Sequence, residues 1–221
     1  MTVRVCHQVP DISININMNN IQIVKSLEPY CFQLDYKLDY PKLMDSMHIL
    51  LERLGQDIDI INQKIVGREL SAYLINLTHL PGLTGTDRFL KHNGSHRSVK
   101  NEGVHEADFS EHLAESQDLY IGQVIRDLYN QHDGKFQGRA SLVWLGPKFQ
   151  YAFHTDPHTP NRYHVPLITN EECYFLLRNT ETFQVHMPAG TAWYLDPIGI
   201  QHTFVNNSNT PRLHLLLTSG F

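Results

Sequence analysis

Four residues in the last third of the chain have the types and spacing of a metal centre with a nearby cation. His154 and Asp156 stand two residues apart, His202 follows 46 residues after Asp156, and Arg212 comes ten residues later. Two histidines and one carboxylate on one face of a small β-barrel form the facial triad that holds non-haem Fe(II) and leaves coordination positions open. Because the set contains no thiolate, Fe(II) or Mn(II) is favoured over structural zinc.

Arg212 follows a turn-rich stretch, 206–211, and begins a predicted final strand. Its planar guanidinium can grip a carboxylate through two parallel hydrogen bonds, so a small dicarboxylate could bridge this cation and the metal. Strand alternation predicts that Arg212 and His214 share one face, while Leu213 and the leucines that alternate with it pack on the other face.

A second pair with the same spacing, Arg162 and His164, is predicted to line the same cavity. Either side chain could equally be an ordinary buried hydrogen-bonding residue of a jelly roll. Tyr163 between them is expected to shape the substrate pocket. Aromatic residues such as Phe175 and Phe204 are expected to belong to the core.

From about residue 138 onward the sequence predicts eight short strands separated by turn residues. They are expected at 140–145, 149–154, 162–168, 173–178, 182–187, 192–195, 202–206 and 212–218. Such a series suits a mainly β fold, a double-stranded β-helix of the jelly-roll or cupin-like kind. His154 and Asp156 would then lie at the end of the second strand and point to the same side of it.

Residues 1–137 are predicted to be a helical and loop elaboration of a single domain that spans residues 1–221, with 138–221 as its core. Helical spacing of apolar residues predicts one helix from Pro41 to about Arg53 and another from Asp108, a plausible N-cap, to about Gln131. The glycine-rich, locally positive segment 80–103 is either a solvated loop or a lid over the active site that could recognise an acidic group.

Composition limits the class of protein. The chain has 221 residues, is 41% hydrophobic and carries a formal net charge of −5, which does not suggest a nucleic-acid partner. No apolar run is long enough for a membrane helix, and the N-terminus lacks an apolar signal core. Cys6, Cys31 and Cys173 are odd in number and widely spaced, so we expect reduced thiols and a cytoplasmic protein.

The order and spacing of these motifs resemble the aspartyl/asparaginyl β-hydroxylase family of Fe(II)- and 2-oxoglutarate-dependent oxygenases. The resemblance covers roughly residues 138–220 and rests on five segments. These are His-Thr-Asp at 154–156, Arg-Tyr-His-Val-Pro-Leu at 162–167, Gly-Thr-Ala-Trp-Tyr-Leu-Asp-Pro at 190–197, His-Thr-Phe-Val-Asn-Asn-Ser at 202–208 and Arg-Leu-His at 212–214.

The resemblance implies iron ligands at His154, Asp156 and His202, and a salt bridge from Arg212 to a carboxylate of 2-oxoglutarate. It places Arg162 and His164 near this cosubstrate and matches Ser141 to a cosubstrate-contacting serine. It implies hydroxylation of an aliphatic C–H bond of an amino acid or peptide side chain by O₂, with release of succinate and CO₂. Because Asp156 is present, the chain looks more like the free-amino-acid hydroxylases of the wider family than like its peptide hydroxylases.

Two other functions fit parts of the pattern. One is a cupin-like metal enzyme that needs no 2-oxoglutarate, and the other is a non-catalytic binding module on the same barrel. Arg212 separates the first of these from the hydroxylase, because only the hydroxylase needs a cation beyond the last metal ligand.

Overall fold

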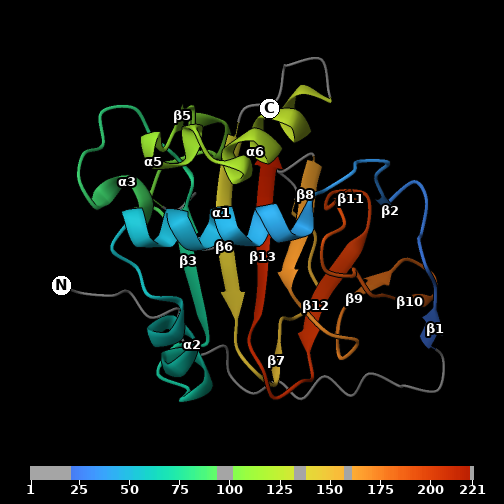
Figure 1. The fold of residues 1–221 in the computed structure, drawn as a ribbon. Helices are drawn as coiled ribbons and strands as arrows, with labels where there is room; N and C mark the ends of the chain where they lie inside the picture. Colours follow the sequence, from blue (N-terminus) through green and yellow to red (C-terminus); the bar gives the residue numbers. More distant parts are fainter. Residues whose placement is uncertain (1–20, 94–101, 132–137, 157–160, 220–221) are drawn as a thin grey trace.

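The computed structural model describes residues 21–93, 102–131, 138–156 and 161–219, and it shows two facing β-sheets with helices outside the larger one (Figure 1). The larger sheet has the strand order β2-β11-β8-β13-β6-β3 and the smaller β1-β10-β9-β12-β7. Strands β4 and β5 form a separate ribbon. The predicted double-stranded β-helix with flanking helices is confirmed.

The thirteen strands in the described part of the chain are mostly short. Their bounds are β1 Ile21–Ile23, β2 Cys31–Gln33, β3 Ala72–Asn76, β4 Thr78–His79, β5 Glu111–His112, β6 Gly138–Leu145, β7 Phe149–Gln150, β8 Asn161–Ile168, β9 Cys173–Arg178, β10 Thr182–Val185, β11 Trp193–Leu195, β12 Gln201–Asn206 and β13 Arg212–Ser219. The helical elements are α1 Tyr40–Arg53, α2 Ile58–Val66, α3 Asp87–Leu90, the 3-10 turn η2 Glu106–Asp108, α5 Ala114–Gln117 and α6 Tyr120–Asn130.

Strand β13 lies at the centre of the larger sheet, paired with β6 on one side and β8 on the other. Its odd-numbered residues Leu213, Leu215 and Leu217 are fully buried in the core beneath the helices. Because side chains alternate along a strand, the even-numbered ones face the smaller sheet. Tyr163 of β8 belongs to the helix-facing core, so the prediction that it shapes the substrate pocket is wrong.

Helix α1 crosses the outer face of the larger sheet (Figure 1). It begins where the Asp39 side chain accepts a hydrogen bond from Lys42 N, and it buries Leu43, Met47 and Leu50 completely. Removing each of these side chains from water stabilises the fold by roughly 2 kcal/mol. Within the described residues, no helix combines the length and apolar character needed to cross a membrane.

The helix predicted from Asp108 to Gln131 is only partly present, since its first half is broken into separate elements. Asp108 ends η2, where its carboxylate accepts from His105 N, and β5 and the one-turn helix α5 follow. Only α6 continues as a regular helix. The segment before α6 is held by contacts with distant elements, such as Glu115 with Arg88 and Asp118 with Arg53. Helical periodicity in the sequence cannot predict such contacts.

Three strands of the two sheets come from residues before 138. Strand β3 pairs with β6, β2 with β11, and β1 runs parallel to β10. The sheets therefore begin earlier in the chain than the sequence predicted. Two of these strands are three residues long, too short for alternation to be recognised.

Candidate metal centre

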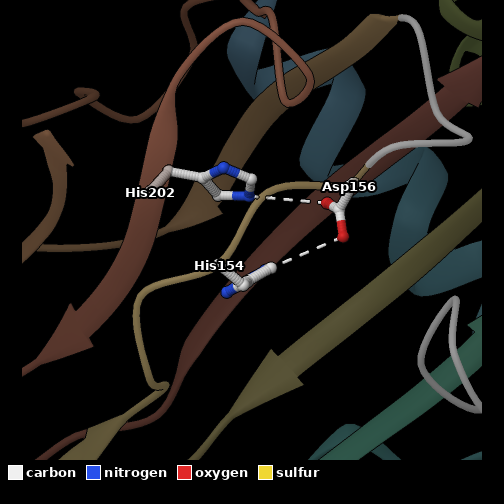
Figure 2. A group of neighbouring side chains, drawn as sticks. All are labelled: His154, Asp156 and His202. Carbon is white, nitrogen blue, oxygen red and sulfur yellow. Dashed lines mark ion pairs between the residues drawn. The ribbon is translucent and has the colours of Figure 1, made fainter. Parts of the chain in front are cut away.

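Three of the residues singled out from the sequence form one cluster. His154, Asp156 and His202 point toward one another (Figure 2), and they offer ligand atoms that all lie within 4.8 Å of each other. His154 Nε2 is 3.8 Å from Asp156 Oδ1, and His202 Nε2 is 3.4 Å from Asp156 Oδ2. These are the same three residues that the sequence predicted to lie together.

The backbone fixes the two histidines against each other. His154 N donates to His202 O at 3.0 Å and His202 N donates to His154 O at 2.8 Å, which makes an isolated antiparallel bridge. Strand β7 itself ends at Gln150, so the prediction that His154 and Asp156 extend one regular strand is wrong. The bridge to β12, not strand alternation, orients His154.

Both imidazole rings are held in the form that can bind a metal. His154 Nδ1 lies 2.8 Å from Ala152 O and His202 Nδ1 lies 3.2 Å from Ile200 O. A carbonyl oxygen can only accept, so each Nδ1 carries a proton, and the neutral form of each ring presents the Nε2 lone pair to a metal. This backbone contact on the far ring nitrogen is the usual outer support of a metal-binding histidine.

Asp156 is buried, and Arg162 compensates its charge. The Arg162 Nη1 atom is 2.8 Å from Asp156 Oδ2, and Asp156 N donates to Pro197 O at 2.8 Å. Burial alone would raise the pKa of this carboxyl, but Arg162 and the two facing histidines together lower it below its usual value. Asp156 is therefore an ionised carboxylate, the form in which it could bind a metal.

The donor set fits Fe(II). It offers two imidazoles and one carboxylate on the same side of a small space, and the buried His202 Nε2 makes no hydrogen bond within the described residues. Buried polar atoms without partners are costly unless something binds them. A facial triad of this kind leaves further coordination positions open for other ligands.

Arg212 lies in the interior at the start of β13, only 4% exposed. Its guanidinium carbon is 3.5 Å from the ring centroid of Phe204 and 5.3 Å from that of Phe175, and Nε donates to His214 Nε2 at 2.6 Å. No carboxylate of the described chain pairs with it. Burial lowers the pKa of Arg212 well below its usual value, so a bound carboxylate would offset the cost of this cation.

His164 occupies the same interior between the metal cluster and Arg212. It is 5% exposed, its ring lies 4.9 Å from Phe175 and 5.7 Å from His214, and neither ring nitrogen makes a hydrogen bond within the described residues. Burial, then Arg212 and Arg162, lowers the pKa of His164 well below its usual value. His164 is therefore a neutral group that can still donate one hydrogen bond and accept another.

Ser141 is on the same inner face. Leu216 of β13 pairs with Ser141 on one side and with His164 on the other, so these three residues form one row across the larger sheet. The Ser141 hydroxyl donates to Asn76 Oδ1 at 2.9 Å. The predicted contact of Ser141 with a cosubstrate stays a prediction.

The sequence interpretation missed the surroundings of Arg212. Phe175 and Phe204 belong to the core, as expected, but they also contact the guanidinium. The signal was the alternation His202, Phe204, Asn206, which places all three on the inner face of β12. Asn206 was interpreted only as the end of a strand and the start of a turn.

The positive segment 80–103 is partly outside the described residues, because 94–101 are not placed. In the described part, Arg88 pairs with Glu115 and His92 pairs with Glu102. These two basic side chains already have acidic partners within the chain. Nothing in the described residues therefore favours a lid that recognises an acidic group over a solvated loop.

Comparison with known proteins adds a family and a fold. The family model described as aspartyl/asparaginyl β-hydroxylase matches residues 108–219. A 2OG-Fe(II) oxygenase-family oxidoreductase from Burkholderia pseudomallei is similar in structure, with a TM-score of 0.52 and 11% identity over 90% of this chain and 94% of that one. The viral collagen prolyl hydroxylase of Paramecium bursaria Chlorella virus-1 has a TM-score of 0.47 and 12% identity, over 86% of this chain and 95% of that one. No curated protein matches the sequence.

Proposed function

As a member of the aspartyl/asparaginyl β-hydroxylase family, this chain is an Fe(II)- and 2-oxoglutarate-dependent hydroxylase, and we propose that it hydroxylates an aliphatic C–H bond of an amino acid, free or within a peptide. The proposed reaction consumes O₂ and 2-oxoglutarate and releases succinate and CO₂. One observation carries the site assignment: the buried Arg212 lies in the same interior between the two sheets as a complete two-histidine, one-carboxylate cluster.

The separation of these groups suits a five-carbon dicarboxylate. His202 and Phe204 are two residues apart on one face of β12, which corresponds to about 7 Å along the strand. The Arg212 guanidinium stacks on the Phe204 ring, so it lies about that far down the barrel from His202. We assign Arg212 to the far carboxylate of 2-oxoglutarate, which it can grip by two hydrogen bonds.

Each chain residue has a separate task. His154, Asp156 and His202 would hold Fe(II), which when bound supplies the oxidising chemistry that no side chain can supply. Arg162 keeps the Asp156 carboxylate ionised and oriented. Phe175 and Phe204 exclude water around Arg212, which strengthens its interaction with a carboxylate.

His164 and Ser141 are assigned to the cosubstrate between these two ends. Neutral His164 can donate to a carboxylate oxygen through one ring nitrogen. The Ser141 hydroxyl can donate to the cosubstrate once it turns away from Asn76 Oδ1. Their row across β8, β13 and β6 would hold the cosubstrate from the side of the larger sheet.

The substrate class rests on the family and on Asp156. The matched family is described by its action on aspartyl and asparaginyl groups. Asp156 completes the ligand set as in the free-amino-acid hydroxylases that the sequence resembles. We therefore place free amino acids first and peptides second in a substrate screen.

The decisive test is an anaerobic titration of the metal-free protein with Fe(II) and then 2-oxoglutarate. We expect a visible charge-transfer band that needs both additions, and that Arg212→Ala weakens while leaving Fe(II) binding unchanged. Candidate amino acids are then added with O₂, and succinate is quantified together with the gain of one oxygen atom in the substrate.

The outcomes separate the alternatives. If iron binds but 2-oxoglutarate produces no band, the cosubstrate assignment is wrong and a cupin-like metal enzyme is the better description. If His202→Ala binds Fe(II) as tightly as the unmodified protein, the cluster is not the metal centre.

A further inference from the structure

Asn206 is a fully buried amide at the end of β12, and its side-chain oxygen accepts three contacts. Ser208 Oγ donates to Asn206 Oδ1 at 2.6 Å, Ser208 N at 3.0 Å, and the Cys173 thiol at 3.2 Å. The first two shape the connection between β12 and β13. The third joins this connection to the start of β9.

The amide nitrogen of Asn206 reaches across to the larger sheet. Asn206 Nδ2 donates to Gly146 O at 2.9 Å, to Thr210 O at 3.0 Å and, more weakly, to Leu145 O at 3.4 Å. Leu145 and Gly146 lie at the end of β6, whereas Asn206 belongs to the smaller sheet. The side chain therefore ties the two sheets together at this end of the barrel.

All of these ties surround Arg212. Leu145 is the direct strand partner of Arg212, and Thr210 precedes it by two residues. Phe204, on which the guanidinium stacks, lies two residues before Asn206 on the same face of β12. One amide thus holds both the backbone that carries Arg212 and the strand against which its guanidinium rests.

We propose that Asn206 is a positioning residue that sets the distance between Arg212 and the metal cluster, and through it the length of dicarboxylate that the enzyme accepts. The inference rests on the proposed function of Arg212. His202 and Asn206 stand on one rigid strand, one at the metal cluster and the other at the Arg212 end. The amide fixes this strand to the larger sheet, so the spacing matches five carbons rather than four or six.

The test compares 2-oxoglutarate with oxaloacetate and 2-oxoadipate, one carbon shorter and one longer, on the Mn(II)-loaded protein. For Asn206→Ala we expect the Kd of 2-oxoglutarate to rise about tenfold or more, because small displacements of a positioning group are costly. The Kd ratio of 2-oxoadipate to 2-oxoglutarate should fall, and Mn(II) affinity should stay unchanged. In turnover, KM for 2-oxoglutarate should rise more than kcat falls.

A second variant and a matched control keep the test decisive. Ser208→Ala removes one donor to the same oxygen, so it should change the Kd values in the same direction by a smaller amount. If Asn206→Ala does not fold, Ser208→Ala serves as the test variant in its place. Asn179→Asp alters an exposed asparagine whose Oδ1 likewise accepts from its turn, at Glu181 N, and it should leave both Kd values unchanged.

Two results would overturn the inference. If Asn206→Ala and Ser208→Ala lower thermal stability but keep the Kd ratio of the dicarboxylates, Asn206 is only a structural tie. If Arg212→Ala also leaves 2-oxoglutarate binding intact, the cosubstrate site itself is misplaced, which is a failure of the proposed function rather than of Asn206 alone.

Discussion

Asp156 can remain charged in a buried position because Arg162 lies 2.8 Å from its carboxylate. Arg162 belongs to β8, the strand next to β13 in the larger sheet, whereas Asp156 belongs to the connection before β8. The larger sheet thus supports a side chain of this connection. Asp156 therefore depends on a partner from a different element for its ionisation and its orientation. Arg162 would therefore support a metal bound by Asp156, because it pairs with the Asp156 carboxylate.

The first prediction concerns this support. Arg162→Gln removes the cation beside Asp156 but keeps a polar side chain of similar reach. We expect Mn(II) affinity to fall by about tenfold, the usual scale for losing an outer support of a metal ligand. Calorimetric titration with Mn(II) at neutral pH measures the change.

Arg178→Gln is the matched control for Arg162→Gln. Arg178 stacks on Phe153, directly before His154, but it contacts no metal-cluster carboxylate among the described residues. Its replacement should leave Mn(II) affinity within about twofold, within the scatter expected for sites that share no partner. Equal Mn(II) affinity in both variants and the unmodified protein would show that Arg162 does not support the metal.

Residue types and spacing were enough to predict the cluster, because a two-histidine, one-carboxylate set followed by an arginine has few other uses. The tautomers of His154 and His202 could not be predicted, since they depend on carbonyls of Ala152 and Ile200 whose direction only the folded backbone defines. Asn206 was missed for a related reason: three of its six contacts, with Leu145, Gly146 and Cys173, come from segments far apart in the sequence.

At the scale of elements, regular alternation was the reliable signal. Strand β13 was predicted at 212–218 and found at Arg212–Ser219, because leucines at every second position face one continuous core. The predicted helix 108–131 failed in its first half, where tertiary contacts hold η2, β5 and α5. The conformation of such short segments is decided more by tertiary contacts than by the periodicity of their own sequence.

The second prediction tests the close packing between α5 and α6. A Cβ built on Gly122 would lie 2.0 Å from Ser116 O, so Gly122→Ala must push the two helices apart. We expect a loss of about 2 kcal/mol in the free energy of unfolding, in the range of overpacked cores. Urea denaturation followed by circular dichroism measures it.

The neighbouring exposed residue provides the comparison for Gly122. Gln123→Ala changes the same helix on its solvent side and should leave the unfolding free energy almost unchanged. If both variants unfold at the same urea concentration as the unmodified protein, α5 and α6 do not pack as closely as described.

At the scale of the whole molecule, ion pairs attach the helices and the segment after β4 to each other and to the barrel. Arg53 pairs with Asp118, Arg88 with Glu115, and the buried Arg139 of β6 with Glu106. These pairs join residues far apart in the sequence. They compensate for the short length of η2, α3 and α5, which bury little apolar surface of their own.

The third prediction is a pH dependence of stability. The hydrogen bond from Arg88 lowers the pKa of Glu115 below its ordinary value of 4.5. A carboxyl with a depressed folded-state pKa stabilises the fold fully above its unfolded-state pKa, and this contribution is lost as pH falls through the folded-state pKa. Glu115→Gln should therefore cost about 1 kcal/mol at pH ~7, and progressively less as the pH falls below the unfolded-state pKa toward ~3.

Thermal unfolding of both proteins across this pH range measures the effect. Glu69→Gln, an exposed carboxylate in the turn after α2, serves as the control and should give a difference that does not change with pH. If the stability difference between Glu115→Gln and the unmodified protein is the same at every pH, the ionised Glu115 does not stabilise the fold through Arg88.

The backbone bridge between His154 and His202 has a consequence for the protein's synthesis. The third residue of the cluster, His202, belongs to β12, and it meets His154 only when β12 has joined β9 in the smaller sheet. A growing chain therefore has no complete metal-binding set until residue 202 has left the ribosome and the smaller sheet has assembled. Iron capture by this cluster would thus follow assembly of the smaller sheet, and a bound ion would report that the barrel has closed.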